Sequence, residues 1–595
     1  MTKKGLPARQ FLTAGKSRNK TKQHGFRNQA AMVAITAAVM GGQGAYAFEI
    51  ETDTPELKVR WDNTVKYSSA WRMNSPDSKL VSAAANTQNP NLDDGDLNFK
   101  RGQISNRLDL LSELDVAYQN VGFRISAAAW DDSKYLGSNA NSGATANQIS
   151  VPGNQFISAT KKIHGSNAEF LDAFAFAKFD LDGKRGTVRA GKHSQVWGES
   201  LFFGANAIAG GMMPVDVVKL VSVPNTQFKE AIRPVQMLSG QLQLNSNVSI
   251  AGYYQYRWAP NRLPASGSYF SQVDPNPDGG ESLNLGFPFL NPATRTDDQR
   301  ASNTGQGGLQ LRLRDGDTDY GFYLIRFHNK GFQQVANLGL MATGIPAPGC
   351  AGAGGVVIGG VCNLAAPSTY RLAYHEGITA FGASFSHTFG DLNLAGEASI
   401  RHNQDLASPN ASDVSALTGG AANNNNSNPA YAVGNTAHIN LSSLWSLAPS
   451  SLFPESSVVA EVAWNRLLHV TKNGNQLDPN ATRDAVAFRG IFEPVYRQVV
   501  PGLDLSVPIG LGWSPKGSRS AVLGPGAFPA DGGGDFSVGV NATYLDAWRF
   551  SLSYTHYFGE TGAFLTPTSA TTNSYSYKQS LADRDFIAFS VRRTF

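Results

Sequence analysis

The residues of this chain that could act chemically do not form a recognisable catalytic pattern. A hydrolase of the usual kind needs a serine or threonine nucleophile beside a histidine that accepts its proton. His193 and Ser194 are the most suggestive neighbouring pair. Adjacent residues of a strand point to opposite faces of the sheet, so these two cannot form a dyad with each other. We therefore expect a protein that is not an enzyme.

Motifs for cofactors and metals are missing from the sequence as well. The chain contains no Walker loop, GxGxxG fingerprint, HExxH zinc motif or GxSxG nucleophile elbow. Its ten histidines are scattered, and no pair has the spacing of a metal site on one strand or helix. We expect neither a cofactor nor a metal.

Cys350 and Cys362 are the only cysteines, and they lie close together in a glycine-rich segment. In a chain exported to an oxidising compartment, this spacing predicts a local disulfide that closes a surface loop. A metal site made from the two thiols would lack its remaining ligands.

The run from Gly191 to Pro234 differs from its surroundings. It is rich in Gly, Met, Phe and Val, has few charges, and lacks the alternation of apolar and polar residues found on either side. Glycines interrupt it too often for a long helix, and it is too apolar for a loop in water. We predict that it folds inward and narrows a membrane pore. The alternative is that this run is a loop packed over the rim of a barrel formed by the alternating segments on either side.

The side chains of this run divide into two groups of candidates. We expect the apolar ones to line the constriction and the path of a solute: Trp197, Phe202, Phe203, Ile208, Met212, Met213, Val217 and Leu220. The polar ones are expected to anchor the loop to charged residues of the lumen, or alternatively to line the constriction: His193, Glu199, Asp216 and Lys219. A proline at the first position also predicts a helical turn over 214–220.

Composition favours strands over helices as the membrane-crossing elements. Only 16% of residues are charged, aromatic residues make up 10%, and 61 residues are glycine. No stretch approaches the ~20 consecutive apolar residues of a spanning helix. Residues 57–71 instead alternate, with Leu57, Val59 and Trp61 on one face and charged residues on the other. That pattern is typical of a transmembrane β-strand.

Short turns alternate with long polar loops along the rest of the chain. The turn at 245–247 is followed by the loop 259–305, and the turn at 390–391 by the loop 403–434, as periplasmic turns and extracellular loops follow each other in outer-membrane barrels. The alternating segments between these turns and loops predict an all-β, antiparallel transmembrane barrel of about 18 strands (16–18) over residues 57–595. The run 191–234 is its third extracellular loop, folded inward. A barrel this wide leaves an aqueous channel unless something fills it.

Both ends of the chain indicate export. Residues 1–47 contain eight basic residues, a short apolar run and the small-x-small sequence Ala45-Tyr46-Ala47, which predicts a signal peptide. Without those eight, 42 of the 50 basic residues remain against 46 acidic ones, a net charge of −4. The basic pI therefore gives no reason to expect nucleic-acid binding. Residues 48–56 are predicted to be a periplasmic segment, and residues 584–595 a closing strand that ends in Phe595.

Several segments resemble one family of Gram-negative outer-membrane proteins, the domain-of-unknown-function 1302 family. They are LKVRWDNTVKYSSAWR (57–72), DGDLNFKRGQISNRLDLLSELDVAY (94–118), RAGKHSQVWGESLFFGANAIAGG (189–211) and PVDVVKLVSVPNTQFKEAIRPV (214–235). The resemblance implies an outer-membrane barrel in contact with lipid and lipopolysaccharide. It also implies genetic association with a lipoprotein-like periplasmic protein and an RND-type transporter, in neighbourhoods that concern hydrophobic compounds. It assigns no binding residues.

These observations lead to one main hypothesis and three alternatives. The main hypothesis is a passive outer-membrane channel for the uptake of small hydrophobic molecules such as steroids, terpenoids, aromatics or lipids. It would work with a periplasmic carrier and an RND-type transporter. The alternatives are a porin for polar or anionic solutes, a structural docking component of a trans-envelope complex, and an outer-membrane hydrolase.

Overall fold

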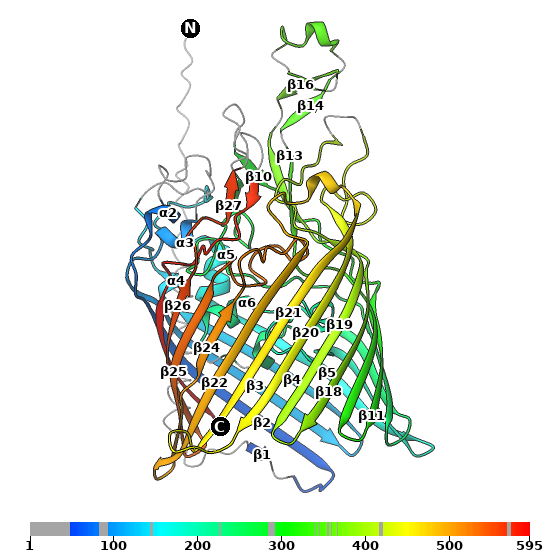
Figure 1. Ribbon diagram of the computed structural model, residues 1–595, viewed down its shortest axis with the longest axis vertical. Coiled ribbons are helices and arrows are strands. Elements are labelled where there is room, and N and C mark those ends of the chain that lie inside the picture. Colours follow the sequence, from blue (N-terminus) through cyan, green and yellow to red (C-terminus); the bar gives the residue numbers. More distant parts are fainter. Residues whose placement is uncertain are drawn as a thin grey trace, which may run out of the picture. The chain divides into compact units, whose positions relative to one another are not determined.

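Eighteen antiparallel strands close into a barrel in the computed structural model (Figure 1). The structure describes residues 48–50, 52–81, 93–142, 147–224, 226, 228–283, 292–337, 339–343, 345–353, 356–358, 360–365, 367–415, 420–567 and 573–595. The predicted signal peptide, residues 1–47, lies outside these ranges. No helix among the described residues is both long and apolar enough to cross a membrane.

The barrel strands follow the chain in order, each paired with the next. They are β2 (Leu57–Arg72), β3 (Gly102–Tyr118), β4 (Val121–Asp132), β5 (Ser166–Leu181), β6 (Lys184–His193), β7 (Val235–Gln243), β8 (Val248–Gln255), β11 (Gln306–Asp315), β12 (Thr318–Phe327), β18 (Ile378–Phe389), β19 (Leu392–Asp405), β20 (Val433–Leu447), β21 (Glu455–Lys472), β22 (Asp484–Val500), β23 (Leu503–Ser506) continued by β24 (Ile509–Trp513), β25 (Gly534–Tyr544), β26 (Trp548–Phe558) and β29 (Phe586–Thr594). The barrel closes where β29 pairs with β2, in the register Lys66↔Arg592.

Alternation along each strand separates an apolar outside from a polar lumen. In β2, Trp61, Tyr67 and Trp71 are exposed on the outer face, whereas Lys66 and Arg72 on the inner face are buried. Large apolar side chains that stay exposed on alternate positions of neighbouring strands are expected where a barrel faces lipid. The predicted fold class, a transmembrane antiparallel barrel of about 18 strands, is confirmed.

One end of the barrel carries short turns and the other carries long loops. The turn between β5 and β6 places Asp182 and Gly183 at φ 53° and 78°, and the turn between β25 and β26 places Leu545 and Asp546 at φ 50° and 55°. In the two-residue turn between β5 and β6, positive φ at both central residues matches the twist of the flanking strands.

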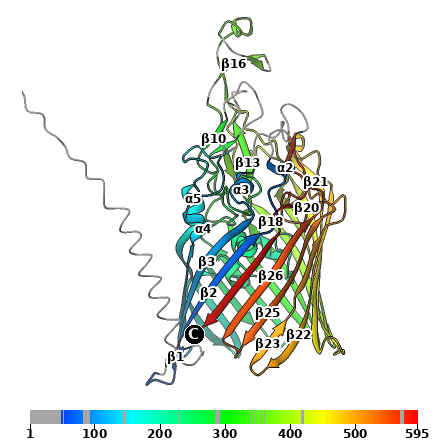
Figure 2. The same ribbon diagram turned by 90° about the vertical axis from the view of Figure 1, so that its left-hand side faces the viewer.

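The long loops contain the remaining short elements. These are α2 (Ser78–Val81), α3 (Asp94–Leu97), α4 (Ser133–Leu136), α5 (Ser158–Thr160), the π-helix η1 (Lys161–Gly165), the 3-10 helix η2 (Ile208–Gly211), α6 (Val217–Ser222), α7 (Phe228–Ala231), β9 (Ser282–Leu283), β10 (Ala293–Arg295), β13 (Gln333–Asn337), β14 (Leu340–Ala342), η3 (Ala347–Gly349), β15 (Val356–Ile358), β16 (Val361–Ala365), β17 (Thr369–Ala373), η4 (Gly474–Gln476), β27 (Leu565–Pro567) and β28 (Asn573–Tyr575). Strands β14–β16 form a small sheet. Figure 1 shows β14 and β16, and Figure 2 shows β16, on an arm that extends beyond β13. There, Cys350 and Cys362 form a disulfide.

Among the strand limits, two differ from the sequence-based expectation for a clear physical reason, and a short strand is added at residues 48–50. The strand predicted to reach residue 196 ends at His193, because the chain turns inward there. The strand predicted over 503–513 is interrupted at Val507–Pro508, where proline has no N–H for the ladder. Residues 48–50 of the predicted periplasmic segment form β1 (Phe48–Ile50), which pairs with the start of β2.

Candidate functional site

The connection between β6 and β7, residues 194–234, folds into the lumen. It is the third of the long loops, as predicted. Trp197, Ile208 and Met212 share a buried cluster with side chains of β8, β12 and β18, among them Tyr253 and Ile325. Met212 is fully buried, and its backbone carbonyl accepts a hydrogen bond from Gln255 of β8 at 2.6 Å.

A single carboxylate fixes residues 200–203 to the wall. Glu461 of β21 is buried and accepts hydrogen bonds from the backbone N–H groups of Leu201 (3.0 Å), Phe202 and Phe203 (3.2 Å). Its other oxygen accepts from the Ser200 hydroxyl at 2.7 Å. Three consecutive amides around one carboxylate are satisfied without water, so this stretch lies firmly against β21.

Two residues of β19 hold the segments on either side of residues 201–203. Glu397 accepts from the backbone N–H groups of Glu199 (2.5 Å) and Ile208 (2.7 Å). The guanidinium of Arg401 donates to the carbonyls of Asn206 (2.9 Å) and Ala207 (2.8 Å). A carboxylate and a guanidinium on the same strand therefore bind the donors and the acceptors of one short loop segment.

Asn206 completes this attachment. Its side-chain amide donates to the Asn440 side chain (2.9 Å) and the Trp464 carbonyl (3.1 Å), and its oxygen accepts from Asn465 (3.1 Å). Asn206 is fully buried. The segment from Trp197 to Met212 is therefore bonded to the inner wall from β8 round to β21.

The structure buries most of the apolar residues that were predicted to line the path. Trp197, Phe203, Ile208, Met212 and Met213 are at most 5% exposed, so in this arrangement they pack the loop against the wall. Of the predicted set, Phe202 and Val217 are half-buried, and Leu220 is 52% exposed. The neighbouring Leu201 (39%) and Val221 (36%) are exposed too. The apolar surface that the loop offers to the lumen is thus concentrated on α6 and Leu201.

The predicted anchoring residues have varied roles. Asp216 caps α6 by accepting from the backbone N–H of Lys219 (3.1 Å), so the helix begins at Val217 rather than at residue 214. Asp216 also pairs with Arg262 (2.8 Å) of the β8–β11 loop. Lys219 is buried beside it. Burial raises the pKa of Glu199 to about 7, against the opposing charge of Arg312.

The second half of the loop reaches the opposite part of the wall. Lys66 of β2 donates to the carbonyl of Pro224 (3.3 Å), and Lys229 of α7 pairs with Glu113 of β3 (2.6 Å). The Lys229 side chain is half exposed, and exposed pairs contribute little to stability. At the start of α6, Arg262 pairs with both Asp216 and Glu169 of β5. The α6–α7 half is therefore attached to β2, β3 and β5 rather than to β19–β21.

His193 forms a pair that the sequence did not reveal. Its Nε2 lies 2.7 Å from Ser239 Oγ of β7, and its Nδ1 lies 3.1 Å from the Gly191 carbonyl. A serine bonded to a histidine is the core of a hydrolase dyad. Both side chains are buried, however, and the histidine is oriented by a carbonyl rather than a carboxylate. The pair fastens the start of the loop to β7.

Sequence reasoning missed Glu397, Arg401 and Glu461, which hold the loop. Their signal was present, since each is a charge at a lumen-facing position of a long alternating strand. The spacing of residues along a strand does not show which of these many charged side chains will contact the loop backbone. Within the described ranges, no three or more His, Cys, Asp or Glu residues are grouped so that they could hold a metal ion.

An 18-stranded barrel with an apolar outer face and a loop folded into its lumen defines the class: a transmembrane β-barrel protein. The chain belongs to the DUF1302 family, a family described as of unknown function, whose model matches residues 28–595. This confirms the resemblance noted in the sequence. No match is found among curated proteins.

Several solved structures are distantly similar to this chain. OccAB3 of Acinetobacter baumannii is 10% identical, with a TM-score of 0.40 over 90% of this chain and 99% of its own. OccAB4 of the same organism is 9% identical, with a TM-score of 0.39 over 90% and 98%. A BenF-like porin from Pseudomonas fluorescens Pf-5 gives the same values. Similarity at this level transfers no substrate and no residue role.

Proposed function

We propose that the protein is an outer-membrane channel for the passive uptake of small hydrophobic molecules. The observation that carries the proposal is the exposed apolar surface of α6, where Leu220 and Val221 face away from the loop's own packing. The lumen around it is lined largely by charged and polar residues. A hydrophobic solute crossing the barrel would therefore find its apolar contacts on α6 and at Leu201 and Phe202.

The two halves of the loop would have different tasks. The Trp197–Met212 half narrows the lumen permanently, because Glu397, Arg401 and Glu461 hold its backbone. The α6–α7 half, which is attached to other strands, would shift to let a solute pass. Transport in this proposal is passive and driven by the solute's own concentration gradient. Delivery to a periplasmic carrier and an RND-type transporter is part of this proposal.

Solute flux into liposomes tests the proposal. Replacing Leu220 and Val221 by Asp should slow the entry of a hydrophobic solute such as a steroid without lowering the yield of heat-modifiable barrel. Val357→Asp, at an exposed apolar position of the extracellular arm, is the matched control. Equal flux through the double variant and the control would remove α6 from the path.

A channel for polar solutes is the second candidate. It is favoured by the burial of five of the eight predicted path residues and by lumen charges such as Arg124 and Arg312. It predicts high ion conductance and rapid entry of small sugars or acids, with little effect of the Leu220 and Val221 substitutions.

A further inference from the structure

The end of the barrel that carries the short turns is uneven, because one hairpin projects beyond its neighbours. Strand β22 pairs with β21 only as far as Val495↔Glu455, but it continues to Val500. The extra residues pair with β23, which pairs in turn with β25 as far as Leu503↔Tyr544. Figure 2 shows β22 and β23 at the end of the barrel opposite the arm that carries β16. The short-turn end of an outer-membrane barrel faces the periplasm, so the hairpin projects into that compartment.

Aromatic side chains mark the level at which the lipid-facing surface ends on this side of the barrel. Near the short-turn ends of β20, β22, β25 and β26 stand Trp445, Tyr496, Tyr544 and Trp548. Aromatic residues form such girdles at the border between hydrocarbon and water. Residues that follow them toward the turns therefore lie outside the apolar band and meet water.

Four large apolar side chains lie in the turns beyond this girdle and remain exposed. They are Leu452 in the β20–β21 turn, Val499 and Val500 in the projecting hairpin, and Leu545 in the β25–β26 turn, here called the rim patch. Their exposed fractions are 71%, 45%, 53% and 62% in that order. Val499 and Val500 are neighbours in sequence and both exposed, so they do not continue the alternation of a lipid-facing strand. Apolar side chains that gather in water mark a surface that contacts another molecule.

Hydrogen bonds hold the three turns of the rim patch side by side. The Tyr496 hydroxyl donates to the carbonyl of Leu452 at 3.2 Å, which fastens the β20–β21 turn to the hairpin. The backbone N–H of Leu545 donates to the carbonyl of Gly502 at 2.8 Å, which fastens the β25–β26 turn to the same hairpin. The four apolar side chains therefore belong to one connected surface.

Acidic residues predominate around the rim patch. Residues 390–391, 448–455, 496–505 and 545–547 contain one basic and four acidic residues, a formal charge of 1 − 4 = −3. These five are Arg497, Asp391, Glu455, Asp504 and Asp546. Arg497 pairs with Glu455 at 2.9 Å and with Asp504 at 3.0 Å. Asp391 and Asp546 are exposed, and neither makes an ion pair with any residue that the structure describes.

We propose that the rim patch is the docking surface for a soluble periplasmic protein whose contact surface is apolar in the centre and basic at its edge. An apolar centre within a polar rim is the usual anatomy of a protein interface. The unpaired carboxylates of Asp391 and Asp546 favour Lys and Arg on the partner.

The same two carboxylates argue against other occupants of the rim patch. A second copy of this chain would bring an identical acidic edge, and anionic phospholipids would be repelled. The position beyond the aromatic girdle also separates the patch from the hydrocarbon of the membrane. The inference takes its purpose from the proposed function, in which the docked protein receives the solute at the mouth of the lumen.

Photocrosslinking in living cells tests the docking surface without requiring transport. Replacing Leu452, Val499 or Leu545 by p-benzoylphenylalanine should, on illumination, join this chain to one and the same soluble periplasmic protein. Mass spectrometry of the crosslinked band identifies that protein. Replacing Leu181 in the same way is the matched control, because it is 57% exposed in the β5–β6 turn, outside the rim patch, and should give no such product.

Binding of the identified protein, purified, to this chain in nanodiscs tests the chemistry of the contact. Leu452→Asp combined with Leu545→Asp should weaken binding by about tenfold or more, because both changes put a charge into the apolar centre. Leu181→Asp should bind as wild type does. Asp391→Lys combined with Asp546→Lys should slow association, and added salt should reduce the difference, since charges at the edge of an interface mainly steer encounter.

The possible outcomes separate the docking surface from the channel. Three crosslinking results would overturn the inference: no protein product from the rim patch, a product with a second copy of this chain, or the same product from position 181. Unchanged binding to the Leu452→Asp and Leu545→Asp double variant would overturn it as well. Docking without flux of a hydrophobic solute into liposomes would support the rim patch and contradict the channel. Flux without any docked protein would support the channel and contradict the rim patch.

Discussion

The attachment of the loop to Glu461 gives the sharpest quantitative prediction. Glu461→Ala leaves the N–H groups of Leu201, Phe202 and Phe203 without their acceptor in a buried site. Each buried, unsatisfied amide costs about 1–3 kcal/mol, and the losses overlap because one acceptor serves all three. A total of about 3 kcal/mol corresponds to a roughly 150-fold larger fraction of detached loop.

Exchange of these three amides measures the effect directly. In Glu461→Ala their protection should fall by about two orders of magnitude, as the preceding energy implies. Glu461→Gln keeps one carbonyl oxygen that can accept from the same amides, so its effect should be much smaller. Glu493→Ala on the neighbouring strand β22 is the matched control, because that carboxylate binds Ser506 rather than the loop. Unchanged exchange in Glu461→Ala would refute the claim that this carboxylate holds the loop.

Three further outcomes are expected. Burial raises the pKa of Glu199 to about 7, so this carboxyl group becomes negatively charged as the pH rises through about 7. Cation selectivity, measured by reversal potential, should therefore rise through about pH 7 in the wild type and stay constant in Glu199→Gln. Arg401→Met removes the donors to the carbonyls of residues 205–207 and should increase current noise while the barrel remains heat-modifiable; noise equal to wild type would contradict its anchoring role. Replacing Cys350 and Cys362 by Ser should make the extracellular arm sensitive to protease without reducing the amount of folded barrel. The reason is that closing a loop of this length stabilises the arm by about 3 kcal/mol. A protease-resistant arm would show that the disulfide is dispensable.

The barrel was predictable because side chains alternate with a period of two along strands. Lys66 and Trp61 follow this alternation, and the turn at Asp182–Gly183 marks where the chain reverses. The inward loop was predictable because an apolar run without alternation must be buried. Its helix was predicted in the right place, but the start at Val217 depends on the Asp216 side chain, which competes with Pro214 for that role.

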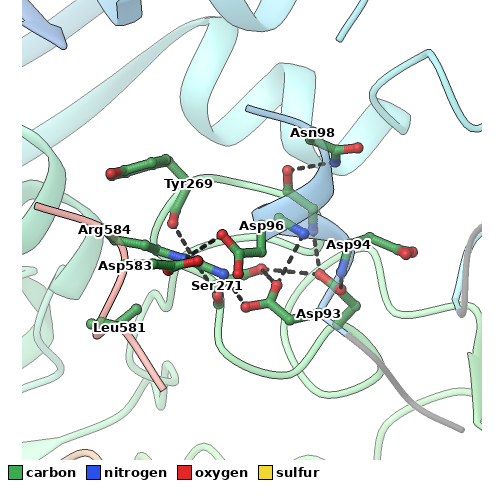
Figure 3. Close-up of polar contacts among 12 residues, drawn as sticks. Asp93, Asp94, Asp96, Asn98, Tyr269, Ser271, Leu581, Asp583 and Arg584 are labelled. Atoms are coloured by element: carbon green, nitrogen blue, oxygen red, sulfur yellow. Dashed lines mark hydrogen bonds and ion pairs between the residues drawn. The ribbon is translucent and has the colours of Figure 1, made fainter. Parts of the chain in front are cut away.

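The contacts that hold the loop were not predictable. Glu461 follows Phe203 by 258 residues, and nothing in the local sequence distinguishes it from other lumen-facing charges. The hydrogen bond from Arg584 to the Tyr269 carbonyl has the same property, since the two residues are 315 positions apart (Figure 3). For the same reason, sequence alone assigned Trp197 and Met212 to the solute path. Whether an apolar side chain faces a solute or the wall depends on the strand opposite it.

A density map of the protein purified from its membrane, with a hydrophobic solute added, tests the central claim most directly. The account predicts residues 197–212 against the inner face of β19–β21 and elongated non-protein density beside Leu220 and Val221 on α6. A lumen in which residues 197–212 leave the wall, or in which solute density lies only on the outer, lipid-facing surface, would contradict it.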